Sequence, residues 1–198
     1  MEDSDDRLLF EDEDLMVLEE TKTTIKTSEP HFFHENDEIY LAGGCYWGLE
    51  KLLIDLSGVN ETEVGFVGGH VKNVCYKEVT QGDTGHAETV KVNFDSSKLS
   101  LEELLRYFFK IHDPTTLNQQ GNDRGSQYRS VIFYTHDNQE IIAQEVIQLV
   151  NQSSSWNAPI VTEIKKFDVF YPAEESHQKY LIKNPDGYSC HFVRKLSF

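Results

Sequence analysis

Residues 41–48, Leu-Ala-Gly-Gly-Cys-Tyr-Trp-Gly, lie between two different patterns of apolar residues. The short apolar run from Glu38 to Ala42 is typical of a buried strand, and two glycines end it. A helical pattern then begins, with a stripe formed by Leu49, Leu52, Leu53 and Leu56. The stretch therefore predicts a strand–turn–helix junction that places Cys45 in the first turn of the helix.

Cys45 would then lie among the unpaired N–H groups and the positive dipole end of a helix start. This setting lowers the pKa of a thiol and favours the nucleophilic thiolate. Glycines at positions 43, 44 and 48 would let a ligand approach the sulfur closely. A buried cysteine packed at a tight turn fits the same residues, so a reactive and a structural role both stay open.

The rest of the chain alternates between strand and helix patterns. Strands are expected at 61–67, 88–95, 129–135 and 160–170, and helices at 46–57, 100–111, 137–150 and 173–182. Ser100 and Glu103 have capping-box spacing, and Asp137 and Glu140 form a second expected cap pair. Residues 114–127 are expected to be a polar loop. The order β-α-β-β-α-β from residue 38 predicts an α+β fold, with a ferredoxin-like core in a mixed sheet covered by helices and an extended C-terminal tail from about residue 183.

Charge divides the 198-residue chain into two parts. The formal net charge is −16, and the first twenty residues hold ten acidic side chains against a single basic one, Arg7. We therefore expect a solvated or disordered tail over residues 1–34 and one domain over residues 35–198. Such a charge argues against nucleic acid and anionic membrane surfaces as ligands.

Targeting signals, membrane spans and metal sites are not expected. The sequence has no run of eighteen apolar residues, and its acidic start fits neither a secretory signal nor a transit peptide. Three cysteines do not make a disulfide framework, so a reducing compartment, the cytoplasm or the nucleus, is expected. His31 and His34 lack a second pair of metal ligands, which argues against a structural zinc.

Glu88 is the most informative position after Cys45. It shares the parity of Val90, Val92 and Phe94, so its carboxylate is expected on the covered face of the sheet. Desolvation there would raise its pKa and let it donate a proton near neutral pH. The alternative is a residue at a strand end that simply reaches water.

Other candidates are weaker on their own. Tyr46 and Trp47 could wall an apolar pocket beside the thiol or belong to the core. Cys190 could reach Cys45 and form a disulfide, or be an idle cysteine in the tail. Cys75 is most simply a packed or loop cysteine.

Separated motifs in this chain resemble the peptide methionine sulfoxide reductase A family. They run from about Ile39 to Cys190 in the family's order and comprise Gly44-Cys45-Tyr46-Trp47-Gly48, Gly65-Phe66-Val67-Gly68-Gly69, Thr84-Gly85-His86-Ala87-Glu88, His112-Asp113-Pro114-Thr115-Thr116, Gln127-Tyr128-Arg129-Ser130 and Asn184-Pro185-Asp186-Gly187-Tyr188.

The resemblance implies an enzyme that reduces methionine-S-sulfoxide, free and in proteins, without a cofactor. Cys45 would attack the sulfoxide sulfur while Glu88 protonates the oxygen, leaving Cys45 as a sulfenic acid. Cys190 would condense with it to a disulfide, which thioredoxin reduces. The substrate would be held by Tyr46, Trp47, Tyr76, Asp123 and Tyr128. The protein is expected to act as a monomer.

Three positions depart from the family pattern. Tyr46 replaces a phenylalanine, so its hydroxyl, if buried, needs a partner. Val74 stands where the family has a proline before Tyr76, which removes a rigid turn. Ser189 separates Tyr188 from Cys190.

Two other functions fit parts of the pattern. A Cys-His acyl-transfer enzyme would need a dedicated base for Cys45, for which His86 or His177 would have to serve. A sulfoxide-binding module without turnover would rest on Tyr46 and Val74.

Overall fold

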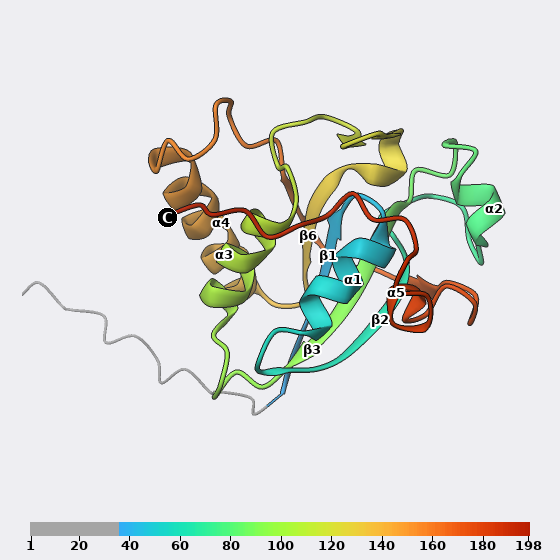
Figure 1. Ribbon diagram of the computed structural model, residues 1–198, viewed down its shortest axis with the longest axis horizontal. Coiled ribbons are helices and arrows are strands. Elements are labelled where there is room, and N and C mark those ends of the chain that lie inside the picture. Colours follow the sequence, from blue (N-terminus) through green and yellow to red (C-terminus); the bar gives the residue numbers. More distant parts are fainter. Residues whose placement is uncertain (1–35) are drawn as a thin grey trace, which may run out of the picture. The chain divides into compact units, whose positions relative to one another are not determined.

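Six strands form a mixed sheet in the order β7-β6-β1-β3-β2-β8 (Figure 1). β1 lies antiparallel between β3 and β6, β3 is antiparallel to β2, and β2 is antiparallel to β8. β7 runs parallel to β6. The strands are β1 Asp37–Gly43, β2 Val59–Val67, β3 Ala87–Phe94, β6 Ser130–Tyr134, β7 Glu163–Lys166 and β8 Phe170–Pro172.

The structure is a computed structural model that describes residues 36–198. These residues lie within one compact unit, Phe33–Phe198. The expected acidic tail over residues 1–34 and the pair His31 and His34 lie outside the described residues. The division of the chain into tail and domain therefore stays a prediction.

Three helices, α1 (Tyr46–Ile54), α3 (Leu101–Ile111) and α4 (Asp137–Gln152), pack on one face of the sheet. Alternate strand residues such as Ile39, Leu41 and Val90 contribute to this main core. The intervening side chains of β1 and β6 form a smaller cluster on the other face, which Phe167 and Phe170 cover. The expected α+β fold with helices against a mixed sheet is confirmed.

The cap predicted for the start of α3 is present, and the cap predicted for the start of α4 is not. The Ser100 hydroxyl accepts from the Glu103 amide at 3.2 Å and the Glu103 carboxylate accepts from the Ser100 amide at 2.9 Å, which confirms the capping box of α3. The cap pair predicted for α4 is wrong, because His136 occupies the cap position and makes no capping hydrogen bond. Asp137 and Glu140 instead lie in the first turn, where acidic charge favours the helix dipole.

The strand predicted over 160–170 is two strands at opposite edges of the sheet. β7 extends the sheet beside β6, and β8 extends it beside β2. Between them the chain crosses under the second face, where Phe167 stacks on Tyr40 with ring centroids 4.0 Å apart and Phe170 lies 5.5 Å from the same ring. Burial of both phenylalanines in one cluster bends the chain away from a single strand.

The remaining connections hold short elements that periodicity does not predict. The stretch 68–86 contains the one-turn helix α2, Tyr76–Val79, and the predicted loop 114–127 contains β4 (Gln119–Gln120), β5 (Asp123–Arg124) and the start of a 3-10 turn, Ser126–Tyr128. After residue 183 the chain makes a turn closed by the Gly187 amide and the Asn184 carbonyl at 3.0 Å, then continues without helix or strand and crosses in front of α1 and α3 (Figure 1).

The helix predicted over 173–182 is shortened to α5, Tyr180–Lys183. Lys179 has a φ of 54°, a left-handed conformation that interrupts a right-handed helix. The buried Glu50 of α1 holds this residue, because its carboxylate accepts from the Lys179 amide at 2.8 Å and from the Thr62 hydroxyl at 3.0 Å. Glu50 thus ties the loop before α5 to the helix that begins at Cys45.

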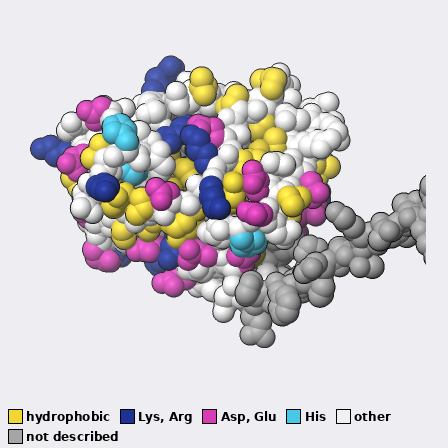
Figure 2. All heavy atoms as spheres, turned by 180° about the vertical axis from the view of Figure 1, so that it is seen from behind, with side chains coloured by type: hydrophobic (Ala, Val, Ile, Leu, Met, Phe, Trp, Pro, Cys, Tyr) yellow, Lys and Arg dark blue, Asp and Glu magenta, His cyan; other side chains and the backbone are white. Residues whose placement is uncertain are grey.

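The surface mixes both signs of charge. Figure 2 shows acidic and basic side chains interspersed around hydrophobic ones on the face turned away in Figure 1. Within residues 36–198, no helix is long and apolar enough to cross a membrane.

Replacing Glu50 tests its role as an anchor. Glu50→Ala leaves the Lys179 amide and the Thr62 hydroxyl without their acceptor, so we expect it to lower the free energy of unfolding by about 1–3 kcal/mol in urea titration. Glu50→Gln keeps an acceptor oxygen and should lose less. Equal stability of Glu50→Ala and the wild type would contradict the anchor.

Candidate active site

Cys45 is the residue that caps the N-terminus of α1. The turn before it depends on Gly44, whose φ is 104°. The first amide of the helix, the N–H of Tyr46, donates to Glu88 Oε2 at 3.1 Å. The strand–turn–helix junction predicted around Cys45 is therefore present, and β3 delivers Glu88 to it.

Glu88 points to the helix-covered face of the sheet, as its parity predicts. Its side chain is 1% exposed. Burial raises its pKa to about 8, the charge of Asp123 adds to the rise, and the Tyr46 N–H opposes it. Near neutral pH the carboxyl therefore holds a proton that it can donate.

The expectation that the helix start favours a Cys45 thiolate is wrong for the resting protein. Burial raises the pKa of the thiol, and the neighbouring acidic groups Glu88, Cys190 and Asp123 raise it further, because each would repel a thiolate once it is ionised. The backbone amide of Trp47 lowers the pKa of Cys45, but burial and the neighbouring acidic groups outweigh this single hydrogen bond from the helix start. The site at rest thus pairs a neutral thiol with a neutral carboxylic acid.

The Tyr46 hydroxyl has a partner, His177. Tyr46 Oη lies 3.0 Å from His177 Nδ1. The Trp47 indole N–H donates to the same nitrogen at 3.2 Å. Tyr46 is fully buried and Trp47 half-buried, with the Trp47 ring stacked on Tyr180 at 3.9 Å between centroids. The substitution of phenylalanine by tyrosine is therefore satisfied inside the fold.

The two candidate tyrosines belong to the same electrostatic environment. Tyr76 begins α2, its ring lies 4.3 Å from that of His177, and burial together with the charges of Glu88, Cys45 and Asp123 raises its pKa to about 12. Burial and the same charges also raise the pKa of Tyr128. Both phenols therefore stay protonated and can donate hydrogen bonds.

Asp123 lies at the entrance to this group. Its Oδ1 accepts from the Tyr188 hydroxyl at 3.2 Å, while its Oδ2 is buried without a hydrogen-bond partner. The carboxylate also raises the pKa of Cys190 through a side-chain hydrogen bond and its charge.

The Cys190 sulfur lies within hydrogen-bonding reach of the Cys45 backbone amide, and all three cysteines of the chain are free thiols. The backbone amide of Cys45 lowers the pKa of the Cys190 thiol, but burial and Asp123 raise it to about 12. Ser189 bends the chain here, because its hydroxyl accepts from the His191 amide at 3.1 Å. The inserted serine thus folds the tail toward the site.

The glycines beside Cys45 make room for this tail. A β-carbon on Gly48 would lie 2.5 Å from Ser189 Oγ and 2.7 Å from His191 Nδ1, and one on Gly44 would lie 2.4 Å from the Gln120 side chain. The open space that the sequence suggested for a ligand is therefore largely occupied by the protein's own residues.

The turn before Tyr76 holds without proline. Asn73 adopts a left-handed φ of 55°, and Glu78 Oε2 accepts from the Cys75 amide at 2.9 Å. These contacts supply a fixed start for α2 in place of a proline ring.

Three contacts in the site were not predicted from the sequence, and one of them involves a residue, His191, that no motif had indicated. His177 binds Tyr46, His191 donates to the Gly43 carbonyl at 2.7 Å, and Tyr188 donates to Asp123. The buried hydroxyl of Tyr46 indicates that a hydrogen-bond partner exists. The position of His191 directly after Cys190 in the sequence likewise indicates that its ring can lie near the thiol. Neither sign names the contact that forms.

The histidines considered as bases for Cys45 have other partners. His86 Nδ1 accepts from the Gly69 amide at 3.1 Å and its Nε2 bonds to the Val71 carbonyl at 2.8 Å. His177 is held by Tyr46 and Trp47. Neither of these two histidines is therefore placed as the dedicated base that a Cys-His acyl-transfer enzyme needs.

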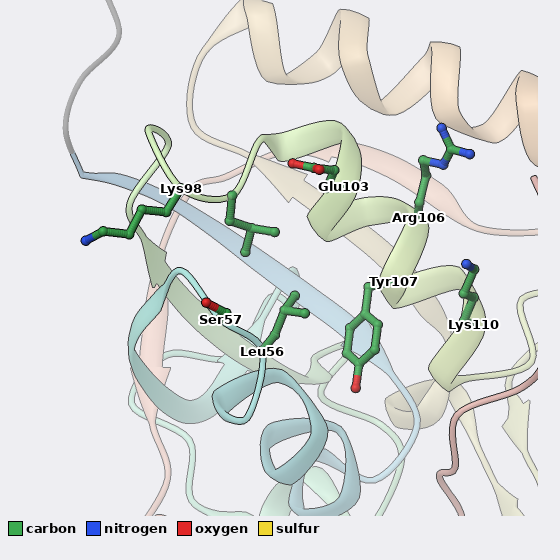
Figure 3. A pocket seen from close by; sticks show the side chains of 8 residues that line it. Leu56, Ser57, Lys98, Glu103, Arg106, Tyr107 and Lys110 are labelled. Atoms are coloured by element: carbon green, nitrogen blue, oxygen red, sulfur yellow. The ribbon is translucent and has the colours of Figure 1, made fainter.

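A separate surface pocket of about 530 Å³ lies between the end of α1 and α3 (Figure 3). Its basic side chains already have partners: Lys98 pairs with Asp95 at 2.6 Å, Arg106 with Glu102 and the Phe198 carbonyl, and Lys110 lies over the Phe198 ring. Its lining does not include Cys45 or Glu88, so we assign it no part in the chemistry.

A family model described as peptide methionine sulfoxide reductase matches residues 37–197. The chain belongs to the peptide methionine sulfoxide reductase A family. An MsrA from Clostridium botulinum is 50% identical over 155 residues, which cover 78% of this chain and 96% of the relative. An MsrA from Trichodesmium erythraeum is 48% identical, with coverage of 79% and 88%.

Solved structures of MsrA proteins have the same fold. The reduced form of Mxr1 from Saccharomyces cerevisiae has a TM-score of 0.77 at 37% identity, covering 81% of this chain and 93% of Mxr1. Methionine sulfoxide reductase A of Corynebacterium diphtheriae has a TM-score of 0.75 at 37% identity, covering 82% of each chain.

The protonation of Glu88 predicts a pH-dependent stability. In the folded protein the pKa of Glu88 is about 8, above its ordinary value of 4.5. The contribution of Glu88 to stability is therefore complete below pH 4.5 and is lost as the pH rises through about 8. We expect the wild type to lose more than about 1 kcal/mol relative to Glu88→Gln between pH 5 and pH 9, measured by urea unfolding under reducing conditions. Parallel stability curves for the two proteins would show that Glu88 is ionised throughout.

Proposed function

We propose that this chain reduces methionine-S-sulfoxide, free and in proteins, with Cys45 as nucleophile and Glu88 as acid. The observation that carries the assignment of roles is the junction itself, where Glu88 accepts from the Tyr46 N–H directly after Cys45 at the N-cap of α1. Membership in the peptide methionine sulfoxide reductase A family establishes thiol-dependent sulfoxide reduction as the activity.

The proposed first step needs both groups neutral at the start. Glu88 donates its proton to the sulfoxide oxygen as the Cys45 sulfur attacks the sulfoxide sulfur, because the oxygen leaves poorly unless it is protonated. The oxygen passes to Cys45, methionine leaves, and the thiol proton restores Glu88. One thiol and one sulfoxide thus give one sulfenic acid and one thioether, and the atoms and electrons balance.

The substrate contacts are proposed from position and character. Tyr76 and Tyr128 donate hydrogen bonds to the sulfoxide oxygen, and Asp123 completes the polar side of the site. Trp47, half-buried at the surface of α1, offers the accessible wall for the methyl group. Tyr46 closes the base of that pocket, with its hydroxyl turned to His177.

The sulfenic acid is then resolved by Cys190. Its half-buried position, the hydrogen bond that its sulfur takes from the Cys45 backbone amide, and the effect of the Cys190 thiol on the pKa of Cys45 support this role. Thioredoxin reduces the resulting disulfide; the related yeast protein Mxr1 has been solved in complex with Trx2.

The wider setting is also a proposal. The protein acts as a monomer in the cytoplasm or the nucleus, where thioredoxin keeps thiols reduced. For the fold, we infer a ferredoxin-like unit made of β6-β1-β3-β2 with α1 and α3, supported by the antiparallel pairing of these four strands.

The alternative of a binding module without turnover loses its two supports. The buried Tyr46 hydroxyl has a partner in His177, and the turn at Val74 is held by Glu78. Neither departure from the family pattern disrupts the junction at Cys45.

An epimer-resolved assay tests the function. Reduced protein with dithiothreitol should remove oxygen from the S epimer of a methionine sulfoxide peptide and leave the R epimer intact, because each reductase class acts on one epimer. Mass spectrometry follows the loss of oxygen. Cys45→Ser should abolish the reaction, and inertness of the wild type toward both epimers would refute the proposal.

The same assay separates the roles of the other residues. Cys190→Ser should form one product and a sulfenic acid but fail to cycle with thioredoxin, and full-rate cycling would exclude Cys190 as the resolving thiol. Glu88→Gln should slow a single turnover about 10²-fold or more, as expected when a general acid is lost. Cys75→Ser serves as the matched control and should react at the wild-type rate.

A further inference from the structure

His191 lies between the two halves of the site. It follows Cys190 in the chain and is 8% exposed. Its Nε2 lies 2.7 Å from the Gly43 carbonyl oxygen, and its Nδ1 lies 3.4 Å from the Cys190 sulfur. Both ring nitrogens are thus engaged, one with the turn that carries Cys45 and one with Cys190.

The contacts fix the tautomer of the ring. A carbonyl oxygen only accepts, so Nε2 must carry the hydrogen that is donated to Gly43. In the neutral ring Nδ1 then has a free lone pair, and that lone pair faces the thiol. Burial and the charge of Arg194 lower the pKa of His191 to about 4, while the Gly43 carbonyl and Asp123 act in the opposite direction, so the ring is neutral at physiological pH.

We propose that His191 is the general base that accepts the thiol proton of Cys190 when Cys190 attacks the sulfenic acid of Cys45. The inference rests on the proposed function, in which Cys190 is the resolving thiol. It adds a base to the second half-reaction, in which Cys45 and Cys190 are the reacting groups and Glu88 has no assigned role.

The step balances with the groups present. The Cys190 sulfur forms a bond to the Cys45 sulfur, the S–O bond of the sulfenic acid breaks, and the thiol proton passes to Nδ1. The leaving hydroxide takes this proton back from the His191 imidazolium and departs as water, so the ring is neutral again. Cys190 is oxidised and the sulfenic sulfur is reduced, so no further reactant is needed.

One charge near the ring, the Asp123 carboxylate, favours this transfer. Cys190 cannot ionise readily by itself, since burial and the Asp123 carboxylate raise its pKa to about 12. The same carboxylate stabilises a protonated His191, so one charge disfavours a bare thiolate and favours the imidazolium. Arg194 and the neighbouring His112 are the other titratable groups near the ring, and the Arg194 charge opposes its protonation.

Two substitutions separate a base from a tether. Gln places an amide nitrogen near the position of Nε2, so His191→Gln can keep the bond to Gly43 and lacks the base. Asn places an amide oxygen near the position of Nδ1, so His191→Asn keeps an acceptor for the thiol but loses the bond to Gly43. Neither amide accepts a proton near neutral pH.

The experiment follows one turnover without external thiol. Fully reduced full-length protein in a Cys75→Ser background is mixed with one equivalent of the sulfoxide peptide and quenched at intervals. Three quantities are measured: thioether product, sulfenic acid trapped by dimedone, and the disulfide between residues 45 and 190. Thermal melting confirms that each variant is folded.

We expect both His191 variants to form product at the wild-type rate and the disulfide about 10²-fold more slowly, with sulfenic acid accumulating. The wild-type rate of disulfide formation should be level between pH 6 and 8, because the base is already free. In His191→Gln it should rise about tenfold per pH unit, since the thiolate must come from solvent.

Other outcomes overturn distinct parts of the account. If His191→Gln forms the disulfide at the wild-type rate and with the wild-type pH profile, His191 is not the base. Asp123 would then be the remaining acceptor for the thiol proton of Cys190. If disulfide formation slows in His191→Asn but not in His191→Gln, His191 only holds the segment to the Gly43 carbonyl and is not a base. Absence of product in the wild type would refute the proposed function itself, and product without any disulfide would refute the role of Cys190.

Discussion

One hydrogen bond joins the two halves of the chemistry, the donation from the Tyr46 amide to the Glu88 carboxyl. The amide belongs to the start of α1 and the carboxyl to β3, so the bond sets the position of Cys45 relative to its acid. This hydrogen bond by itself lowers the pKa of Glu88. Burial has the larger effect and raises the pKa to about 8. The helix start therefore stabilises the position of the acid as well as the thiol, and burial of the two groups together keeps both neutral.

The second constraint is the path of the C-terminal segment. Residues 189–191 pass over the faces of Gly44 and Gly48, where a β-carbon would collide with Gln120, Ser189 or His191. Two glycines that suggested ligand access thus also admit the protein's own second thiol. This explains why the segment lies against Cys45 although it has no helix or strand of its own after residue 183.

Local patterns in the sequence predicted the parts of the site that local chemistry determines. The glycine turn before Cys45 and the parity of Glu88 depend on a few neighbouring residues, and both agree with the structure. The pKa of Cys45 depends on burial by distant segments, so the expected thiolate was wrong. Likewise, Tyr46 meets His177 across 131 positions, and the split of residues 160–170 depends on an apolar cluster on the far face of the sheet. No periodicity in the sequence contains that information.

The central claim is that Glu88 is protonated in the resting enzyme and becomes ionised only above neutral pH. Infrared difference spectra of the wild type minus Glu88→Gln isolate the carboxyl stretch of this one side chain. The account predicts a protonated carboxyl band at pH 6 that is lost with a midpoint near pH 8. A carboxylate band already complete at pH 6, with no protonated band, would contradict it.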